Sequence, residues 1–247
     1  MPAPTPATVS TASPVSSPAK IPLRERKYYQ TRIRLARALR EQLEQVSLDD
    51  LNVRDLCDVV EVSEATFFNY FPKKSDLLAY LSQLWSVELA WHGQQALAAP
   101  SSGGSPGAGS GLGVVQAVFE RAAQQFQIAP GAAGELIAWQ ARTRQRQAPA
   151  QLDVSERRLA FPEQPGIETM TDQSLEQVLA TALQRAIDQG ELPRNIHLPT
   201  TMVALVSVFY GVPLALRLSN PAGIGAMYRQ QLMILWTGLR QVAAARG

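Results

Sequence analysis

Apolar residues recur at spacings of three and four along nearly the whole chain after residue 22. This is the repeat of a helix with one buried face, and no segment shows the convincing alternation of a half-buried strand. The pattern predicts an all-α protein. The expected helices cover 33–46, 52–60, 64–71, 77–97, 114–126, 132–146, 175–188, 200–217 and 224–242. The last is the most regular, with a broad apolar face.

Two segments break this pattern. Residues 1–22 hold six prolines and seven serines or threonines, without the basic start and apolar run of a secretory signal. They are predicted to be a disordered tail. Residues 99–113 contain six glycines, and we expect a flexible loop there without regular structure.

The stretch 195–216 carries no charged residue, which raises the question of a membrane span. It is interrupted by Pro199, Gly211 and Pro213, so a buried helix explains it better. With no membrane segment and no export signal, the chain is expected to be cytoplasmic.

Residues that could support catalysis are scarce. Cys57 is the single cysteine, and the two histidines, His92 and His197, lie far apart in the sequence. None of the four lysines follows a glycine, so a phosphate-binding loop of the Walker type is absent. The sequence therefore predicts no enzyme, no metal site and no cofactor.

The formal net charge of +2 argues against a protein that coats nucleic acid through bulk charge. The charge is unevenly distributed, however. Residues 20–40 hold eight basic residues and one acidic residue, a net +7, so the rest of the chain sums to −5. By itself this basic start is equally well explained as a solvated helix face.

The segment that follows has the pattern of a helix-turn-helix. A short amphipathic helix over 52–60 is followed by a three-residue connection that ends in Ser63, a favourable N-cap. A second short helix, 64–71, is closed by Pro72. Two short helices joined in this way are typical of DNA-binding proteins.

The second of these helices has two different faces. Phe67 and Phe71, with Tyr70 beside them, are expected to face the core. The residues that project away are Glu64, Ala65, Phe68 and Asn69. A small, an apolar and two polar side chains suit a major groove, where apolar groups meet thymine methyls and polar groups meet base edges.

Residues 32–78 resemble the TetR family of bacterial transcriptional repressors. The matching features are the basic first helix, Val53-Arg54-Asp55-Leu56, Val62-Ser63-x-x-Thr66-Phe67-x-x-Tyr70-Phe71, Lys74 and Leu77-Leu78. The resemblance implies a three-helix DNA-binding domain at 23–74 and a larger effector-binding and dimerisation domain at 75–247. It also implies that 64–71 is the recognition helix, that Ser63, Thr66 and Lys74 contact phosphate, and that Arg54 touches DNA.

Two positions depart from the family pattern. The turn position that is usually glycine is Glu61, and the aromatic residue that is usually tyrosine is Phe68. These departures keep open a second hypothesis, a helical interaction protein of the same fold that has lost DNA binding. Glu64 also has two interpretations, as an acceptor for a cytosine amino group or as a first-turn residue favoured by the helix dipole.

The C-terminal part resembles the same family more weakly. The segment 186–193 and the apolar helix with Gly211 resemble its dimerisation region, so the helices at about 200–217 and 224–244 are expected to pair with those of a second copy. The expected interface residues are Leu205, Phe209, Tyr228, Leu232, Leu235 and Trp236.

An effector pocket is expected between the glycine-rich loop and this interface. Its candidate residues are Trp85, His92, Phe119, Phe126 and Trp139. Such a set predicts an apolar effector, with His92 as one of few polar groups; ordinary core packing is the alternative. Arg142, Arg144 and Arg146 are expected to be solvated or to hold an acidic ligand.

Together these expectations describe a homodimeric, ligand-responsive repressor of an inverted-repeat operator in double-stranded DNA. The two recognition helices would enter successive major grooves.

Overall fold

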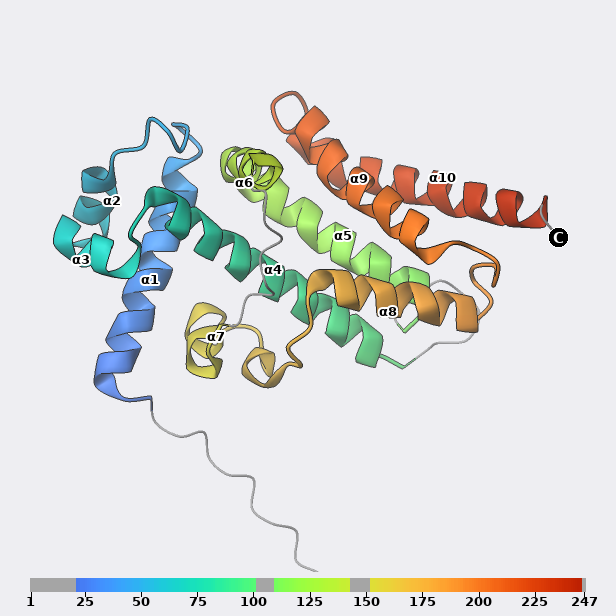
Figure 1. Cartoon of the computed structure of the whole chain (residues 1–247), viewed down its shortest axis with the longest axis horizontal. Coiled ribbons are helices and arrows are strands. Elements are labelled where there is room, and N and C mark those ends of the chain that lie inside the picture. The colour runs from blue at the N-terminus through green and yellow to red at the C-terminus, as the bar shows by residue number, and fades with distance from the viewer. Residues whose placement is uncertain (1–20, 101–108, 143–151, 246–247) are drawn as a thin grey trace, which may run out of the picture.

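The computed structural model describes residues 21–100, 109–142 and 152–245, and all regular elements in these ranges are helical, as predicted (Figure 1). In chain order they are α1 (Leu23–Gln42), α2 (Val53–Val60), α3 (Glu64–Tyr70), α4 (Lys74–Ala98), α5 (Gly111–Ile128), α6 (Pro130–Arg142), α7 (Val154–Ala160), η1 (Ile167–Thr169), α8 (Leu175–Asp188), α9 (Leu198–Leu216), η2 (Pro221–Gly223) and α10 (Ile224–Ala244).

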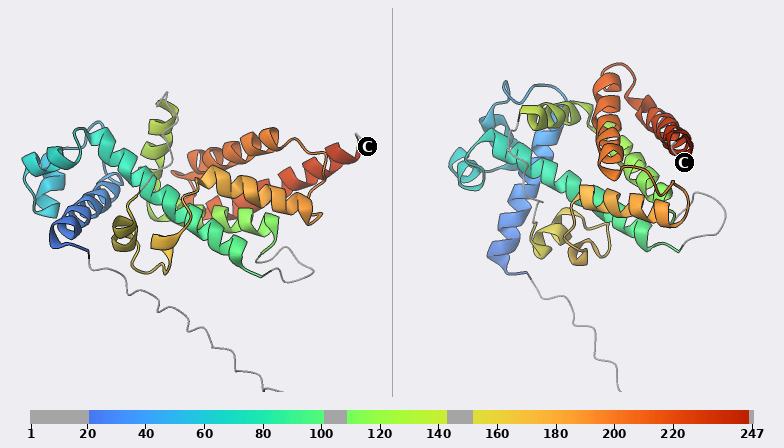
Figure 2. Two further views of the ribbon diagram at one scale, coloured as in Figure 1. Left: turned by 60° about the horizontal axis from the view of Figure 1, so that its bottom comes forward. Right: turned by 45° about the vertical axis from the view of Figure 1, so that its right-hand side comes forward.

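The helices are arranged as a small head and a larger body. Helices α1, α2 and α3 lie together at one end of the molecule, and α4 runs from them into the body (Figures 1 and 2). Helices α8, α9 and α10 lie toward the opposite end. The long helix α4 therefore connects the head directly to the body.

Buried apolar side chains form two clusters. The head cluster contains Leu39 of α1, Leu56 of α2 and Phe67 of α3, and it continues along α4 as far as Trp91 and into α6 at Leu136. The other is built from α5, α8, α9 and α10. Each element hides one apolar face, which is what the three-four repeat predicted.

The start of α6 ties the body to the end of α1. The Glu44 carboxylate accepts hydrogen bonds from the backbone N–H groups of Gly131 (2.9 Å) and Ala132 (3.0 Å). A carboxylate satisfies the free N–H groups of a helix N-terminus and is favoured there by the helix dipole. A Cβ on Gly131 would lie 2.1 Å from the Leu43 carbonyl oxygen, so only glycine permits this contact.

The glycine-rich segment is more ordered at its end than the sequence suggested. Helix α5 begins at Gly111, inside the segment 99–113 that was expected to lack regular structure. A Cβ on Gly111 would lie 2.2 Å from the Ala186 backbone nitrogen, so this glycine allows α5 to touch α8. The other part of the expected loop, 101–108, the tail at 1–20, and Arg144 and Arg146 lie outside the described residues.

Helix α9 is exposed on one side. Length and composition alone would let it cross a membrane, and 28% of its apolar window is buried in the chain. The expectation of a buried helix is therefore correct for one face and wrong for the other. Val203, Val206 and Leu214 point outward.

Candidate nucleic-acid interface and effector cavity

Local capping defines the two helices of the head. The Asn52 side chain accepts from the Arg54 backbone N–H at 3.0 Å and begins α2, and Ser63 accepts from the Thr66 N–H at 3.1 Å and begins α3. Both bonds satisfy donors that a helix start leaves free. The N-cap predicted at Ser63 is confirmed.

The turn between α2 and α3 contains a residue in the left-handed backbone conformation. Glu61 has φ 60° and ψ 48°, and it has a positive φ without being glycine. A left-handed residue commonly ends a helix, and a side chain there costs about 1 kcal/mol. Glu61 thus adopts the geometry for which the family pattern has glycine.

Helix α3 has one buried and one exposed face. Phe67 is fully buried, and its ring meets those of Phe68 and Phe71 at centroid distances of 5.2 and 6.0 Å. Phe68 itself is 47% exposed. The remaining outward residues proposed for base contact, Glu64, Ala65 and Asn69, are also exposed. A phenyl ring thus stands among small and polar groups on an open surface.

The residues proposed for phosphate contact are placed differently from one another. The hydroxyls of Ser63 and Thr66 are hydrogen-bonded to each other at 2.9 Å at the start of α3. Arg54 is exposed in the first turn of α2. The Lys74 ammonium instead donates to the carbonyl oxygens of Asp49 and Leu51, both at 2.9 Å.

Lys73 was missed by the motif comparison. It is exposed, and its backbone N–H donates to Asp76 at 2.9 Å where α4 begins. Because the Lys74 ammonium is engaged with the loop between α1 and α2, Lys73 is the freer cation at this position. The doublet Lys73-Lys74 was visible in the sequence, but which of the two points outward depends on where α4 begins.

One arginine of the basic start lies inside the molecule. Arg32 forms an ion pair with Glu156 of α7 at 3.0 Å, and its guanidinium lies 4.2 Å from the centre of the Tyr80 ring. The Tyr80 hydroxyl donates to Glu156 at 2.6 Å. Burial raises the pKa of the Glu156 carboxyl, while the bond from Tyr80 and the charge of Arg32 counter the rise. This cluster joins α1, α4 and α7.

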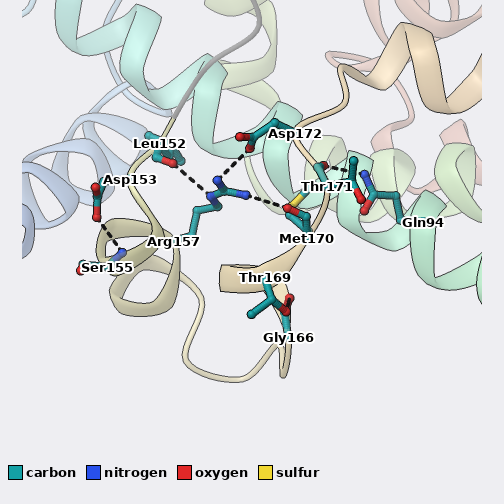
Figure 3. A network of polar contacts seen from close by, with 10 residues as sticks. All are labelled: Gln94, Leu152, Asp153, Ser155, Arg157, Gly166, Thr169, Met170, Thr171 and Asp172. Carbon is teal, nitrogen blue, oxygen red and sulfur yellow. Dashed lines mark hydrogen bonds and ion pairs between the residues drawn. The ribbon is translucent and has the colours of Figure 1, made fainter. Parts of the chain in front are cut away.

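Helix α7 was not predicted, and a second arginine holds it in place. Arg157 donates to the carbonyl oxygens of Leu152 (3.0 Å) and Met170 (3.3 Å) and pairs with Asp172 at 2.7 Å (Figure 3). Gln94 of α4 donates to the Thr171 carbonyl at 2.9 Å. A seven-residue helix gives little periodic signal, so these distant partners could not be read from the sequence.

A cavity of about 210 Å³ lies where the head meets the body. Helix α1 lines it with Ile33, Ala36, Arg37 and Arg40; α4 with Leu81, Leu84, Trp85 and Glu88; α5 and the following residue with Arg121, Gln125, Ile128 and Ala129; and α7 with Ala160 and Phe161. Glu88 accepts hydrogen bonds from Arg121, Gln125 (2.6 Å) and Gln164 (3.0 Å).

One of the five residues expected at an effector pocket lines this cavity, Trp85. Phe119 and Phe126 are buried and pack against the ring of Phe209, in agreement with the alternative prediction of ordinary core packing. Trp139 packs against the head cluster.

His92 lies deeper in α4, with its ring 4.8 Å from that of Trp91. Burial lowers the pKa of His92, with a further contribution from the charge of Arg121. Both effects favour the neutral imidazole.

The residues expected at a dimer interface lie on the inner side of α9 and α10. Leu205, Phe209, Tyr228, Leu232 and Trp236 are buried within the single chain, and Leu235 is half-buried. The Tyr228 hydroxyl donates to the Phe209 carbonyl at 2.5 Å, which ties the two helices together. These five side chains pack within the chain, so their expected contact with a second copy stays a prediction.

The same helix pair also carries exposed apolar residues. Those with large side chains are Val203, Val206 and Leu214 on α9 and Met233, Ile234 and Val242 on α10. We call these six residues the outer face. A Cβ on Gly211 or Gly238 would meet nothing within 4 Å, so nothing in the described chain requires a glycine at either position.

Three solved structures show the same fold. PfmR, a TetR family transcriptional regulator from Thermus thermophilus, has a TM-score of 0.54 at 16% identity and covers 83% of this chain and 98% of its own. GusR from Salmonella enterica has a TM-score of 0.53 at 14% identity, with coverages of 86% and 96%. A structure described as a molecular basis for control of antibiotic production by bacterial hormones has a TM-score of 0.58 at 19% identity, with coverages of 85% and 98%.

No curated protein sequence matches the chain significantly. Residues 35–81, from the middle of α1 to the first turns of α4, match the family model described as "Bacterial regulatory proteins, tetR family". The matched segment is the head described above, and the rest of the chain has the fold of such regulators. Residues 35–81 are therefore similar to the TetR family of bacterial regulatory proteins, and the chain as a whole shares the fold of TetR family transcriptional regulators.

Proposed function

We propose that this protein is a homodimeric, ligand-responsive repressor that acts in the cytoplasm and binds an inverted-repeat operator through α3. The observation that carries the proposal is the exposed face of α3. The exposed ring of Phe68 stands among small and polar side chains on this face, and a major groove supplies thymine methyls for such a ring. Asn69, one position further, carries the amide group that pairs with adenine edges.

The basic side chains of the head supply the electrostatic part of DNA binding. Arg24, Arg34 and Arg54 are exposed, as is Lys73. Contacts between such side chains and phosphates release counterions and make binding depend on salt concentration. Lys74 and Arg32 are engaged inside the protein, so we expect them to contribute less.

Dimerisation is supported by the outer face of α9 and α10. Six exposed apolar side chains on two adjacent helices are unusual for a monomer and are typical of a surface that pairs with another chain. Gly211 and Gly238 each weaken their helix by about 1 kcal/mol relative to alanine, a cost that close approach of a partner helix would justify.

The alternative, a protein of this fold that no longer binds DNA, has one observation in its favour. Glu61 and Glu64 are both exposed at the turn and at the start of α3, and their charges would repel phosphate. The outward Phe68 and the exposed basic residues argue for the DNA-binding hypothesis.

Selection from a pool of random DNA duplexes, followed by sedimentation of the complex, tests the proposal. We expect an inverted repeat whose half-site centres are one helical turn apart, about 34–36 Å, or a multiple of it. We expect two chains, or a multiple of two, on each duplex. A monomer, or a dimer that enriches no inverted repeat, would contradict the proposal. Replacement of the exposed Val59 on α2 by alanine is the matched control and should select the same sequence.

A further inference from the structure

The cavity between α1, α4, α5 and α7 has an unequal distribution of charge. Glu88 is its one acidic lining residue, and this carboxylate is satisfied by Arg121, Gln125 and Gln164. Arg37 and Arg40 of α1 also line the cavity; Arg37 is exposed and Arg40 is half-buried. Three arginines against one carboxylate leave the lining with a net charge of +2.

The two arginines of α1 that line the cavity, Arg37 and Arg40, make few polar contacts with the described residues. Arg37 makes a long hydrogen bond of 3.4 Å to the Ala160 carbonyl. Arg40, half-buried at the cavity, makes no hydrogen bond or ion pair with another described residue. A guanidinium in a partly apolar cavity is stabilised by an anion, and its planar donor fork matches both carboxylate and phosphate.

The other walls are apolar and limit the size of an occupant. Ile33, Leu84, Trp85 and Phe161 contribute aliphatic and aromatic surface. The cavity volume of about 210 Å³ is below the roughly 300 Å³ at which cavities for drug-sized ligands begin, so it suits a small occupant.

We propose that this cavity binds a small amphiphilic carboxylate, with its anionic group on Arg37 and Arg40 and its apolar body against Trp85 and Phe161. The inference deepens the proposed function, on which its regulatory meaning rests, and it replaces the expected apolar effector with an anionic one. It also places the ligand between the two parts of the molecule, because the arginines belong to α1 of the head and the apolar wall to α4 and α7.

This position gives the ligand a direct effect on the head. Helix α1 meets α4 and α7 at the Arg32–Glu156–Tyr80 cluster, and Arg32 and Tyr80 directly precede residues that line the cavity, Ile33 and Leu81. A ligand that binds α1 and α4 together favours one spacing between them. It shifts the operator affinity by as much as its own affinity differs between the two spacings.

Titration calorimetry on the full chain without DNA tests the site. The probes are benzoate, phenylacetate and hexanoate, each compared with its neutral amide, and inorganic phosphate. We expect at least one acid to bind about tenfold more tightly than its amide. Arg40→Gln and Arg37→Gln should each remove most of that preference. Arg158→Gln, at an exposed arginine of α7 outside the cavity, is the matched control and should keep it.

Four results would overturn the inference: no acid binds at millimolar concentration, amides bind as tightly as acids, phosphate alone binds as tightly as the acids, or both arginine variants keep the preference. Operator affinity of the ligand-free chain is measured in parallel. If DNA binds and no acid does, the site is wrong and the DNA-binding function stands. If acids bind and no DNA does, the proposed function fails and the site stands.

Discussion

The head and the body of this protein are both built from helices with a buried apolar face. They differ in whether the residues expected to be functional are exposed or buried. In the head, the residues proposed to touch DNA lie on the open side of α3, and the buried side is held by Phe67. In the body, the residues expected at the dimer interface are the buried ones, and a second apolar face lies outside them. An apolar stripe on a helix therefore does not identify a functional surface by itself. Whether the residues on the other side of the helix are buried or exposed must be known as well.

The largest effects should separate neighbouring residues of α3. Phe67→Ala removes a fully buried ring and should lower the free energy of unfolding by about 3–5 kcal/mol. Phe68→Ala should change stability by less than about 0.5 kcal/mol, as at other surface positions, yet weaken operator binding. Urea unfolding and fluorescence anisotropy on the selected operator measure the two. If Phe68→Ala bound the operator as well as wild type, the outward ring would have no role in recognition.

The helix pair of the body allows the same comparison. Leu232→Ala should cost about 2–5 kcal/mol of stability because Leu232 is 4% exposed. Ile234→Glu, two positions away and 55% exposed, should leave the fold intact and place a charge on the outer face. We expect it to dissociate the dimer in sedimentation experiments. A dimer that survives both Ile234→Glu and Val206→Glu would place the interface elsewhere.

A smaller effect is expected at the turn of the head. Glu61→Gly should raise stability by about 1 kcal/mol, because glycine adopts the left-handed conformation without a Cβ penalty. Glu61→Ala removes the same charge but keeps the Cβ, so it should not stabilise the chain. Thermal unfolding of the two variants separates backbone strain from charge. Equal stability of both variants would mean that φ 60° carries no cost here.

The smallest effect concerns acid sensitivity in the body. Burial lowers the pKa of His92, so below about pH 6.5 the unfolded chain takes up a proton that the folded chain resists. Stability should therefore fall as the pH drops from about 7.5 to about 5.5, and His92→Gln should reduce that fall. Melting temperatures at both pH values provide the measurement. An unchanged pH dependence would show that His92 titrates alike in the folded and unfolded chains.

Much of the head could be predicted because its signals are local. The cap of α3 joins Ser63 to Thr66, which are neighbours in the sequence, and it needs no distant partner. The alternation of buried and exposed positions on α3 follows from helical geometry alone. The same local signals predicted the start and end of α8, Leu175 and Asp188, correctly.

The rest depends on contacts between distant residues. Arg32 was counted with the basic start, but Glu156, 124 positions along the chain, turns it inward. Helix α5 can begin against α8 because residue 111 is a glycine, and the cavity exists because α1 meets α4, α5 and α7. Since both sides of α9 are apolar, its sequence pattern does not distinguish the inner side from the outer one.

The central claim is that the open face of α3 reads DNA sequence, and one comparison of selected operators tests it most directly. Wild type and Asn69→Ala are each used to select from the same pool of random duplexes. The account predicts an inverted repeat for wild type and, for the variant, loss of base preference at one symmetric pair of positions, with about 1–3 kcal/mol less discrimination there. The same consensus with the same preferences from both proteins would contradict it.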